Sequence, residues 1–490
     1  MKHRFFRLLA IFCISFPVQA AQAGGLASKV RDLAKKAPLR TAQWGVCVKD
    51  AGTGKTLVDW DSDKSLVPGS TLKLFVTAAA LSSLGPEFRF STLLRHDGAV
   101  SAGVLKGNLV IRGGGDPSLG STLVRGGRPM EAVFADWLKA LSDKGIKAVQ
   151  GDVVGDNTLF EGPPIPGSWP WEDAGNYYAA PADALTINDN LYHLYFAPGP
   201  GVGADAEVLR MEPEIPGLKF VNFMKTGPED SGDNGYVYNI PAGYHAVLRG
   251  TLPAGRKEFA IKGAIPEPAL FAAQAFAGFL RKSAIKVVGQ ARLLRKPVSY
   301  DEEKVLCRTP SVPLRDIVRL TNKRSFNLYA EMLSRAVALR TGRPASVEGA
   351  NLAVREHLRS AGIDMAGVRI EDACGLSRLD LVTARAMTDA LVFMAKSRFF
   401  ADYHESLAFP GDPEGFGHIK SFGRGTELEK SLRIKSGSLS GVRSYSGYLR
   451  NKAGRLLAFT FIVNNYAASP AEIEKIHEEL LLALAQGRGG

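Results

Sequence analysis

The chain is poor in cysteine and lacks long apolar runs. Its 490 residues include four cysteines, which excludes a scaffold built on disulfide bonds. No stretch approaches the about 18 consecutive apolar residues that a membrane-spanning helix needs. The glycine, proline and leucine contents exclude collagen, coiled-coil and disordered chains. The composition is that of a globular protein, and the length predicts about three domains of roughly 150 residues each.

Several functional signatures are also missing. There is no Gly-x-Ser-x-Gly elbow, and the eight histidines show no metal-ligand spacing. Gly54–Thr56 resembles the end of a phosphate-binding loop, but Lys49 stands where that loop needs glycine. We predict neither a metal nor a cofactor. The formal charge of +12 comes from dispersed Lys and Arg, which indicates solvated faces and no nucleic-acid site.

The first residues have the pattern of a secretory signal peptide. Three cations precede the apolar run Leu8–Val18, and small residues follow at Ala20 and Ala23. We expect residues 1–23 to be removed and the mature protein to be exported to the periplasm, with no transmembrane segment. Removing three cations leaves 58 − 49 = +9. The remaining thiols, Cys47, Cys307 and Cys374, are odd in number, so at least one stays unpaired within the chain.

Hydrophobic patterns predict strands and buried helices near both ends. An antiparallel hairpin is expected over 44–61, and the segment 70–81 is apolar on all sides, as in a buried helix. Strands are expected over 431–434, 441–449 and 456–463, and a capping box at 469–472 begins a helix that reaches about residue 484. In the middle, helix-to-strand corners are predicted at 137–154, 279–294 and 357–371, so this part is α+β.

Three short motifs carry the chemistry: Ser70-x-x-Lys73, Ser325-x-Asn327 and Lys435-Ser436-Gly437. On a helix, residues three apart lie on the same face, so Lys73 can reach Ser70. Burial lowers the pKa of a lysine, which can then accept the proton of a serine nucleophile. The three motifs in this order, the first on a buried helix and the last on a strand, are far more specific than any one alone.

Two further matches to these motifs are decoys. Ser283 and Lys286 fall in a predicted helix-to-strand corner, without a buried helix behind the serine. Lys225–Gly227 runs into Pro228 and acidic residues, so we expect it to be a loop. The sequence therefore singles out Ser70 and Lys435 from their alternatives.

The three motifs resemble those of penicillin-binding proteins and serine β-lactamases. The chain is most similar to one branch, the D-alanyl-D-alanine carboxypeptidase/endopeptidases of low-molecular-mass class C. Ser325 follows Lys73 at a spacing of 325 − 73 = 252 positions, and members of that branch carry extra domains there. Family-like stretches are Gly113–Pro117, Gly155–Phe160, Trp169–Trp171, Cys374–Arg378 and Lys435–Leu449.

The resemblance implies an α+β fold. A transpeptidase-like domain, an antiparallel sheet flanked by helices, would comprise residues 24–91 and 301–490. Two smaller α/β domains would be inserted over 92–300. Ser70 and Ser325 would then meet at one site, although the insert separates them in sequence.

The resemblance also implies an activity on peptidoglycan stem peptides. Ser70 would attack the carbonyl between two terminal D-alanines, with Lys73 as proton acceptor, and β-lactams would inhibit covalently. Ser325, supported by Lys435, would pass a proton to the leaving amine. Asn327 would hold the substrate amide, and Ser436 the terminal carboxylate. The N–H groups of Ser70 and Ser438, which follows Gly437, would form the oxyanion hole.

Two more positions match the family's site for the diamino acid of the stem peptide. Asp156 and Arg378 could pair with the amine and the carboxylate of that side chain. Each has a structural alternative: Asp156 lies among turn-forming residues and could form a local Asx turn, and Arg378 could be a surface ion-pair partner.

Two other functions remain open from the sequence. A β-lactamase would share the acylation groups, but no Glu-x-x-Leu-Asn-like segment follows Ser325, and the long insert favours a peptidoglycan enzyme. A non-catalytic wall-binding or scaffold protein on the same fold would have no need for Ser70, Lys73, Ser325 and Lys435 together.

Overall fold

The computed structural model describes residues 18–283, 285–299, 301–415 and 417–487. The predicted signal peptide lies largely outside this range, and its predicted cleavage positions fall in the first turns of helix α1 (Val18–Ala34). In the part of the chain that the structure describes, no helix is long and apolar enough to cross a membrane.

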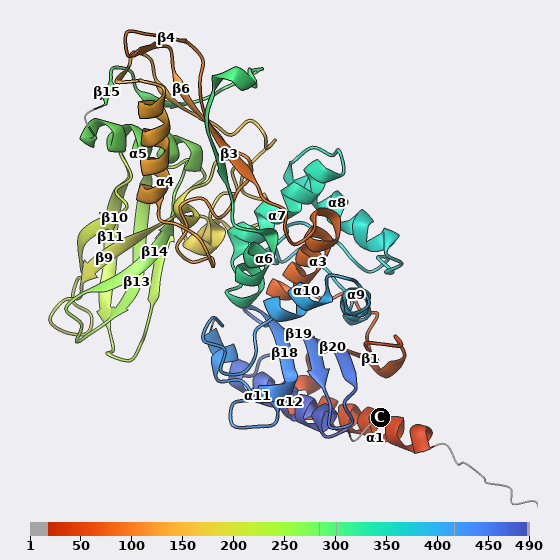
Figure 1. Ribbon diagram of the computed structural model, residues 1–490. Helices are drawn as coiled ribbons and strands as arrows, with labels where there is room; N and C mark the ends of the chain where they lie inside the picture. Colours follow the sequence, from red (N-terminus) through yellow and green to blue (C-terminus); the bar gives the residue numbers. More distant parts are fainter. Residues whose placement is uncertain (1–17, 284, 300, 416, 488–490) are drawn as a thin grey trace, which may run out of the picture.

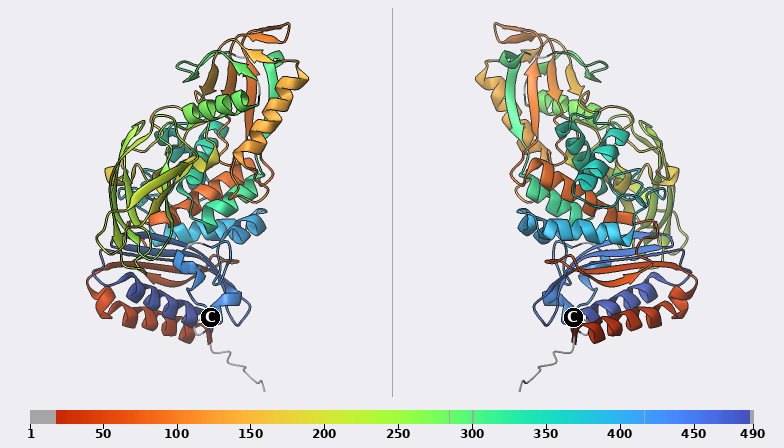
Figure 2. Two further views of the ribbon diagram at one scale, coloured as in Figure 1. Left: turned by 90° about the vertical axis from the view of Figure 1, so that its left-hand side faces the viewer. Right: turned by 90° about the vertical axis from the view of Figure 1, so that its right-hand side faces the viewer.

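A five-stranded antiparallel sheet forms the centre of the larger body (Figures 1 and 2). Its strand order is β18 (Leu432–Leu439), β19 (Val442–Arg450), β20 (Leu456–Asn464), β1 (Gln43–Asp50), β2 (Thr56–Trp60). Strand β20 is buried on both faces: Phe459 and Phe461 point to one hydrophobic cluster, Ala458 and Ile462 to the other. This explains its continuous apolar sequence.

Helices cover both faces of this sheet. On one side, α1 and α12 (Pro470–Ala485) lie next to each other, as Figure 2 shows, and α12 begins with the predicted capping box at Ser469 and Glu472. On the other side, α3 (Lys73–Leu84) is buried from Lys73 to Leu81 among further helices. These are α6 (Leu314–Lys323), α7 (Asn327–Arg340), α8 (Val347–Ser360), α9 (Ala384–Ala395) and α10 (Phe400–Ser406); α2 (Ala37–Arg40) and α11 (Leu428–Ser431) are short.

The segment between α3 and α6 forms a separate insert, at the upper left of Figure 1. Its first lobe contains helices α4 (Met130–Asp143) and α5 (Pro268–Lys282) and two sheets, β15-β7-β5-β4 and β16-β8-β6-β3-β17. The strands are β3 (Ser91–His96), β4 (Ala99–Ser101), β5 (Val104–Lys106), β6 (Leu109–Arg112), β7 (Ala148–Val149), β8 (Val153–Asp156), β15 (Lys286–Val287), β16 (Ala291–Leu293) and β17 (Val305–Pro310).

The second lobe consists of two three-stranded sheets, β10-β9-β14 and β11-β13-β12. Its strands are β9 (Leu191–Ala197), β10 (Glu207–Glu212), β11 (Lys219–Gly227), β12 (Asn234–Tyr238), β13 (His245–Pro253) and β14 (Phe259–Ala264). The predicted α/β content applies to the first lobe, because the second contains strands and no α-helix between residues 191 and 264. One hydrophobic cluster joins both lobes, so they form one insert.

The structure corrects two local predictions. Lys225–Gly227 was expected to be a loop, but it ends strand β11, since its backbone pairs in parallel with Thr251–Pro253 of β13. The corner predicted over 357–371 contains its helix, α8, but no strand follows, and Arg369 forms only an isolated bridge with Leu381. The terminal strands and the buried helix are confirmed within a few residues.

The predicted domain boundary at residue 300 lies, in sequence, between β16 and β17, two strands of one sheet of the insert. Strand β17 pairs with β3, so residues 305–310 return along the first strand of the insert. We therefore propose that the insert runs from Ser91 to Pro310 and that the remainder forms one split domain.

Candidate active site

Ser70 and Lys73 lie where a short 3-10 helix, η1 (Gly69–Leu72), continues into α3. The Nζ of Lys73 donates a hydrogen bond to the Oγ of Ser70 at 2.9 Å. This is the contact that the Ser-x-x-Lys spacing predicts. Ser70 lines a cavity, whereas Lys73 is completely buried behind it.

Burial lowers the pKa of Lys73 below the usual lysine value, although Asp372, Glu331 and other nearby acidic groups act in the opposite direction. A second hydrogen bond, from Nζ to the carbonyl oxygen of Cys374 at 2.6 Å, fixes the side chain. The amine is therefore both oriented toward Ser70 and shifted toward its neutral, basic form.

Ser325 and Lys435 form a second serine–lysine pair. The Nζ of Lys435, on strand β18, donates to the Oγ of Ser325 at 2.9 Å and to the carbonyl oxygen of Ser436 at 2.7 Å. Burial, followed by the positive charge of Lys73, holds the pKa of Lys435 well below its usual value. Ser325 has a φ of 56°, a strained conformation for a residue with a side chain and one that clusters at functional sites.

Two glycines allow the backbones of strand β18 and of a neighbouring loop to lie very close to the turn that contains Ser70. A Cβ at Gly437 would lie 2.4 Å from the carbonyl oxygen of Pro68 and 2.9 Å from the nitrogen of Ser70. Gly375, with a φ of +80°, approaches from the other side, and a Cβ there would lie 2.0 Å from the oxygen of Gly69. The third motif and the Cys374–Arg378 stretch thus hold the Ser70 turn between them.

The insert also contacts the second motif. The Nδ2 of Asn327, at the first position of α7, donates to the carbonyl oxygen of Tyr178 at 2.7 Å. Tyr178 belongs to the 3-10 helix η3 (Tyr177–Ala179) of the insert. No motif in the sequence pointed to Tyr178, because its contact is made by backbone and depends on the tertiary fold.

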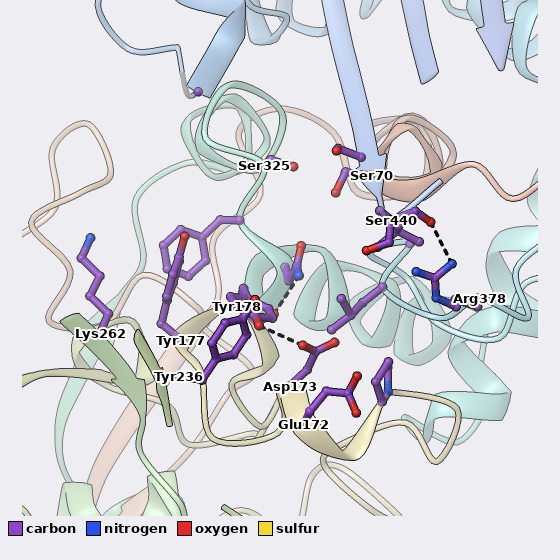
Figure 3. A pocket seen from close by; sticks show the side chains of 18 of the residues that line it. Ser70, Glu172, Asp173, Tyr177, Tyr178, Tyr236, Lys262, Ser325, Arg378 and Ser440 are labelled. Atoms are coloured by element: carbon purple, nitrogen blue, oxygen red, sulfur yellow. Dashed lines mark hydrogen bonds between the residues drawn. The ribbon is translucent and has the colours of Figure 1, made fainter. Parts of the chain in front are cut away.

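One cavity of about 1260 Å³ contains both serines (Figure 3). Its walls come from the split domain and from the insert. Of the predicted site residues, those that line it are Ser70, Ser325, Asn327, Ser436, Ser438 and Arg378. Lys73, Lys435 and Gly437 lie directly behind this lining and contact or adjoin the serines.

Asp156 is the predicted site residue that the structure does not bring to the cavity. It ends strand β8, is 1% exposed, and its Oδ1 accepts hydrogen bonds from the N–H and the Oγ1 of Thr158. This is the Asx turn that was its structural alternative. Arg378, in contrast, is exposed at the cavity and donates to the carbonyl oxygen of Ser440 at 3.2 Å.

A different carboxylate, Asp173, faces the cavity. It accepts a hydrogen bond from the hydroxyl of Tyr178 at 2.8 Å. Burial raises its pKa, and the positive charge of Arg378 acts in the opposite direction. Asp173 and Arg378 thus place a carboxylate and a guanidinium at the same cavity.

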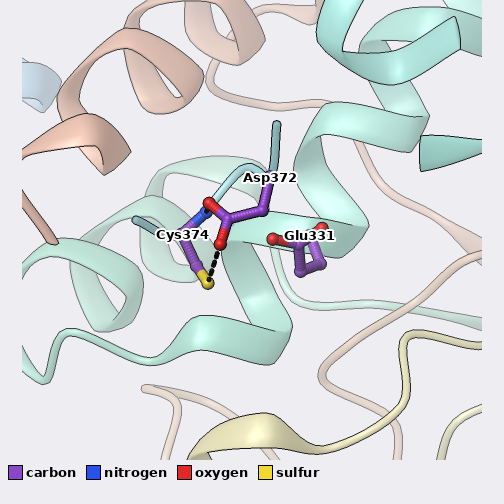
Figure 4. A group of neighbouring side chains, drawn as sticks. All are labelled: Glu331, Asp372 and Cys374. Atoms are coloured by element: carbon purple, nitrogen blue, oxygen red, sulfur yellow. Dashed lines mark hydrogen bonds between the residues drawn. The ribbon is translucent and has the colours of Figure 1, made fainter. Parts of the chain in front are cut away.

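A buried cluster of Glu331, Asp372 and Cys374 adjoins Lys73 (Figure 4). The two Asp372 oxygens accept six hydrogen bonds, from the N–H groups of residues 374–377, from the thiol of Cys374 and from the indole of Trp169 at 2.8 Å. These bonds satisfy the carboxylate oxygens and fix the conformation of the loop over residues 374–377. The carbonyl oxygen of Cys374 in this loop accepts the hydrogen bond from Lys73. The cluster therefore has a structural explanation, and Trp169 links the insert to it.

Burial raises the pKa of all three thiols that the structure describes. Cys47, Cys307 and Cys374 are free, and burial raises the pKa of Cys374 well above the usual thiol value. A protonated thiol is a poor nucleophile. The contact of Cys374 with Lys73 is made by its backbone carbonyl oxygen.

The chain is similar to known proteins over nearly its full length. The D-alanyl-D-alanine carboxypeptidase of Actinomadura sp. is 29% identical over 487 residues, covering 96% of this chain and 87% of that protein. The D-alanyl-D-alanine carboxypeptidase DacB of Haemophilus influenzae is also 29% identical, over 90% of this chain and 89% of that protein.

Solved structures agree with this similarity. The crystal structure of penicillin binding protein 4 from Haemophilus influenzae superposes with a TM-score of 0.80 at 27% identity, over 93% of this chain and 99% of that one. The predicted fold class is thereby confirmed. Residues 26–486 match the profile of the D-Ala-D-Ala carboxypeptidase 3 (S13) family, and the chain belongs to that family.

Proposed function

We propose that the protein is a serine D,D-peptidase that acts on peptidoglycan stem peptides through an acyl-enzyme on Ser70. It releases the terminal D-alanine or cleaves the equivalent bond in a cross-link, and penicillins acylate the same serine. The observation that carries this proposal is the pair of serine–lysine contacts, Lys73–Ser70 and Lys435–Ser325, at one cavity. Membership of the S13 family and the names of the relatives support it.

The geometry suggests how the proton moves. The Oγ of Ser70 attacks the carbonyl carbon of the penultimate D-alanine, and the neutral Nζ of Lys73, 2.9 Å away, accepts its proton. When the C–N bond breaks, Ser325 passes a proton to the leaving amine, and Lys435 supports Ser325 electrostatically. Water then hydrolyses the ester and frees Ser70.

Groups around the serine would bind the remaining substrate atoms. The backbone N–H groups of Ser70 and Ser438 form the oxyanion hole, which the close approach at Gly437 makes possible. Asn327 holds the substrate amide, and Ser436 binds the terminal carboxylate beside the Lys435 charge.

Arg378 is suited to a carboxylate on the diamino acid, because it is exposed at the cavity. The role of Asp156 stays a prediction that the geometry does not favour, since its Oδ1 accepts the Asx-turn bonds and its side chain is buried. Asp173, which faces the cavity, is better placed to bind the amine.

The same proposal places the protein outside the cytoplasmic membrane, in the periplasm, because its substrate is there. The pattern of residues 1–23 supports export. The two alternatives fit less well: a scaffold protein would not need the two serine–lysine contacts, and a β-lactamase would not need the insert that shares the cavity.

The activity is tested by incubating the purified protein with a stem pentapeptide and with cross-linked muropeptides, followed by mass spectrometry. Loss of D-alanine shows carboxypeptidase activity, and cleavage of the cross-bridge shows endopeptidase activity. If neither product forms and no penicillin is bound, the proposal is wrong.

Replacing Gly437 with alanine should damage both stability and acylation. The new Cβ would lie 2.3 Å from the Oγ of Ser444 and 2.9 Å from the nitrogen of Ser70. We expect a loss of about 1–3 kcal/mol in unfolding free energy from overpacking, and acylation slower by about 10²-fold because Ser70 is displaced. Thermal melts and penicillin-acylation kinetics measure both effects.

Gly278→Ala is the matched control for Gly437→Ala. Gly278 lies inside helix α5, and a Cβ there meets no atom within 4 Å. It should stabilise the protein by roughly 0.5–1 kcal/mol and leave acylation unchanged. If Gly437→Ala and Gly278→Ala had the same effect on unfolding free energy and on the acylation rate, the role assigned to the close approach at Gly437 would be wrong.

Acylation should depend on pH through Lys73. Only the neutral amine accepts the serine proton, so the rate falls as pH decreases through the folded-state pKa of Lys73. Because burial lowers that pKa, the midpoint of this rise should lie below the pH of about 10.4 at which an ordinary lysine is half neutral. The measurement is the second-order acylation rate of a fluorescent penicillin across pH; a midpoint at or above that value would contradict it.

A further inference from the structure

On one face of the sheet β11-β13-β12, apolar, aromatic and basic side chains point away from the hydrophobic core. Tyr236 pairs with Arg249, and Tyr238 with Val247, across β12 and β13. Paired residues of neighbouring strands share a face. In β11, Phe223 pairs with Arg249 and Val221 with Val247, so they continue the same face.

This face is exposed to solvent, whereas the opposite face packs into the hydrophobic core of the insert. Val221 is 51%, Phe223 50% and Tyr236 43% exposed. Met224, Val237 and Leu248, which point the other way, are at most 1% exposed and belong to the insert's hydrophobic cluster. Contiguous exposed apolar and aromatic residues of this kind mark an interaction site.

The open face is continuous with the cavity that contains Ser70. Tyr236, Tyr238, Val247 and Arg249 line that cavity. Trp171, 72% exposed, packs against Tyr238 with ring centroids 5.6 Å apart. We call the insert wall the six cavity-lining residues Trp171, Tyr177, Tyr236, Tyr238, Arg249 and Lys262.

The insert wall lies on a defined side of the reactive serine. Figure 3 shows Arg378 and Ser440 on one side of Ser70, and Lys262 and Tyr177 on the other, beyond Ser325. Ser325 is the residue proposed to protonate the leaving amine. Whatever is attached to that amine must therefore extend toward the insert wall.

We propose that the insert wall is a subsite for the second peptide strand of a cross-link, the strand that departs with the leaving amine. A released D-alanine fills only a small part of a cavity of about 1260 Å³, which exceeds the roughly 300–1,000 Å³ of a typical small-molecule site. This inference rests on the proposed function and assigns the insert a part in selecting cross-linked substrates.

The charges of the wall match such a strand. A departing stem peptide carries carboxylates, and Lys262 and Arg249 of the wall, with Arg324 beside it, are cationic. Lys262 lies 5.5 Å from the ring centroid of Tyr177, which adds an aromatic surface beside the charge. The cavity's own acids, Glu172 and Asp173, lie between Tyr236 and Arg378 in Figure 3.

The test compares two substrates in the double variant Arg249→Gln, Lys262→Gln. We expect kcat/KM for cleavage of a soluble cross-linked stem-peptide dimer to fall at least tenfold. D-Alanine release from a soluble pentapeptide and penicillin acylation should stay within twofold. The matched control is Lys219→Gln, Arg256→Gln, which removes two exposed cations of the same lobe outside the cavity lining and should change neither substrate.

A binding measurement separates this inference from the proposed function. With the acylation-deficient Ser70→Ala protein as background, calorimetry measures the Kd for the intact dimer, which the wall substitutions should raise at least tenfold. An unchanged Kd, or equal loss of activity on dimer and pentapeptide, overturns the subsite. Absence of any turnover in the wild-type protein would instead overturn the proposed function, while the binding result still decides the subsite.

Discussion

The Ser70→Ala variant is expected to bind no penicillin covalently and to release no measurable D-alanine. The Oγ of Ser70 is the atom that forms the acyl bond, and Lys73 is hydrogen-bonded to it. In other serine hydrolases, loss of the nucleophile lowers kcat by about 10⁶-fold. Gel fluorescence after labelling with a fluorescent penicillin measures the first effect, and mass spectrometry of the pentapeptide digest the second.

Ser283→Ala is the control for this prediction, because Ser283 and Lys286 repeat the Ser-x-x-Lys pattern elsewhere. Ser283 ends helix α5 and donates to the carbonyl oxygen of Phe279 at 2.9 Å, while Lys286 is exposed. Labelling should be unchanged in this variant. A Ser70→Ala protein that still labels would show that the nucleophile has been assigned wrongly.

The Lys73→Met variant is expected to fold but to acylate about 10³-fold more slowly. Methionine fills the buried volume, yet it removes the base that accepts the Ser70 proton, and general-base groups contribute about 10²–10⁴-fold. The rate should remain low at every pH, since no titrating amine is left next to Ser70. Stopped-flow acylation kinetics and a circular-dichroism spectrum check activity and folding together.

Lys286→Met, in the decoy pair, should leave acylation unchanged. If Lys73→Met retained the wild-type rate and its pH dependence, another group would have to take the serine proton. Lys435, whose Nζ contacts Ser325, would then become the first candidate base.

The regular elements near both ends of the chain could be predicted because local patterns determine them. The alternation in β1, the continuous apolar run of β20 and the capping box of α12 are properties of a few consecutive residues. Lys225–Gly227 was mistaken for a loop because its strand is stabilised by parallel pairing with a segment 26 positions away, Thr251–Pro253, which local composition does not reveal.

The reactive groups could likewise be predicted, but their surroundings could not. The spacing of Ser70 and Lys73 determines their contact within one helical turn. The hydrogen bonds from Asn327 to Tyr178 and from Trp169 to Asp372 join segments 149 and 203 positions apart. Asp156 was chosen by position in a family-like stretch, and its buried Asx turn appears only in the fold.

The position of the insert shows that it is part of the site. The length suggests about three separate domains. However, β3 at the start of the insert pairs with β17 at its end, so the chain leaves the split domain and returns to it at adjacent points. Within the insert, the carbonyl oxygen of Tyr178 accepts a hydrogen bond from Asn327 of the second motif, and the insert wall lines the cavity. The insert is therefore placed to act on substrate selection as part of the site.

The location of the covalent bond decides whether Ser70 is the nucleophile. The wild-type protein is incubated with penicillin, digested with trypsin and analysed by tandem mass spectrometry. We expect one modified peptide, with the added mass on Ser70. An adduct on Ser325, on Ser283 or on any other residue, or no adduct at all, would contradict this assignment.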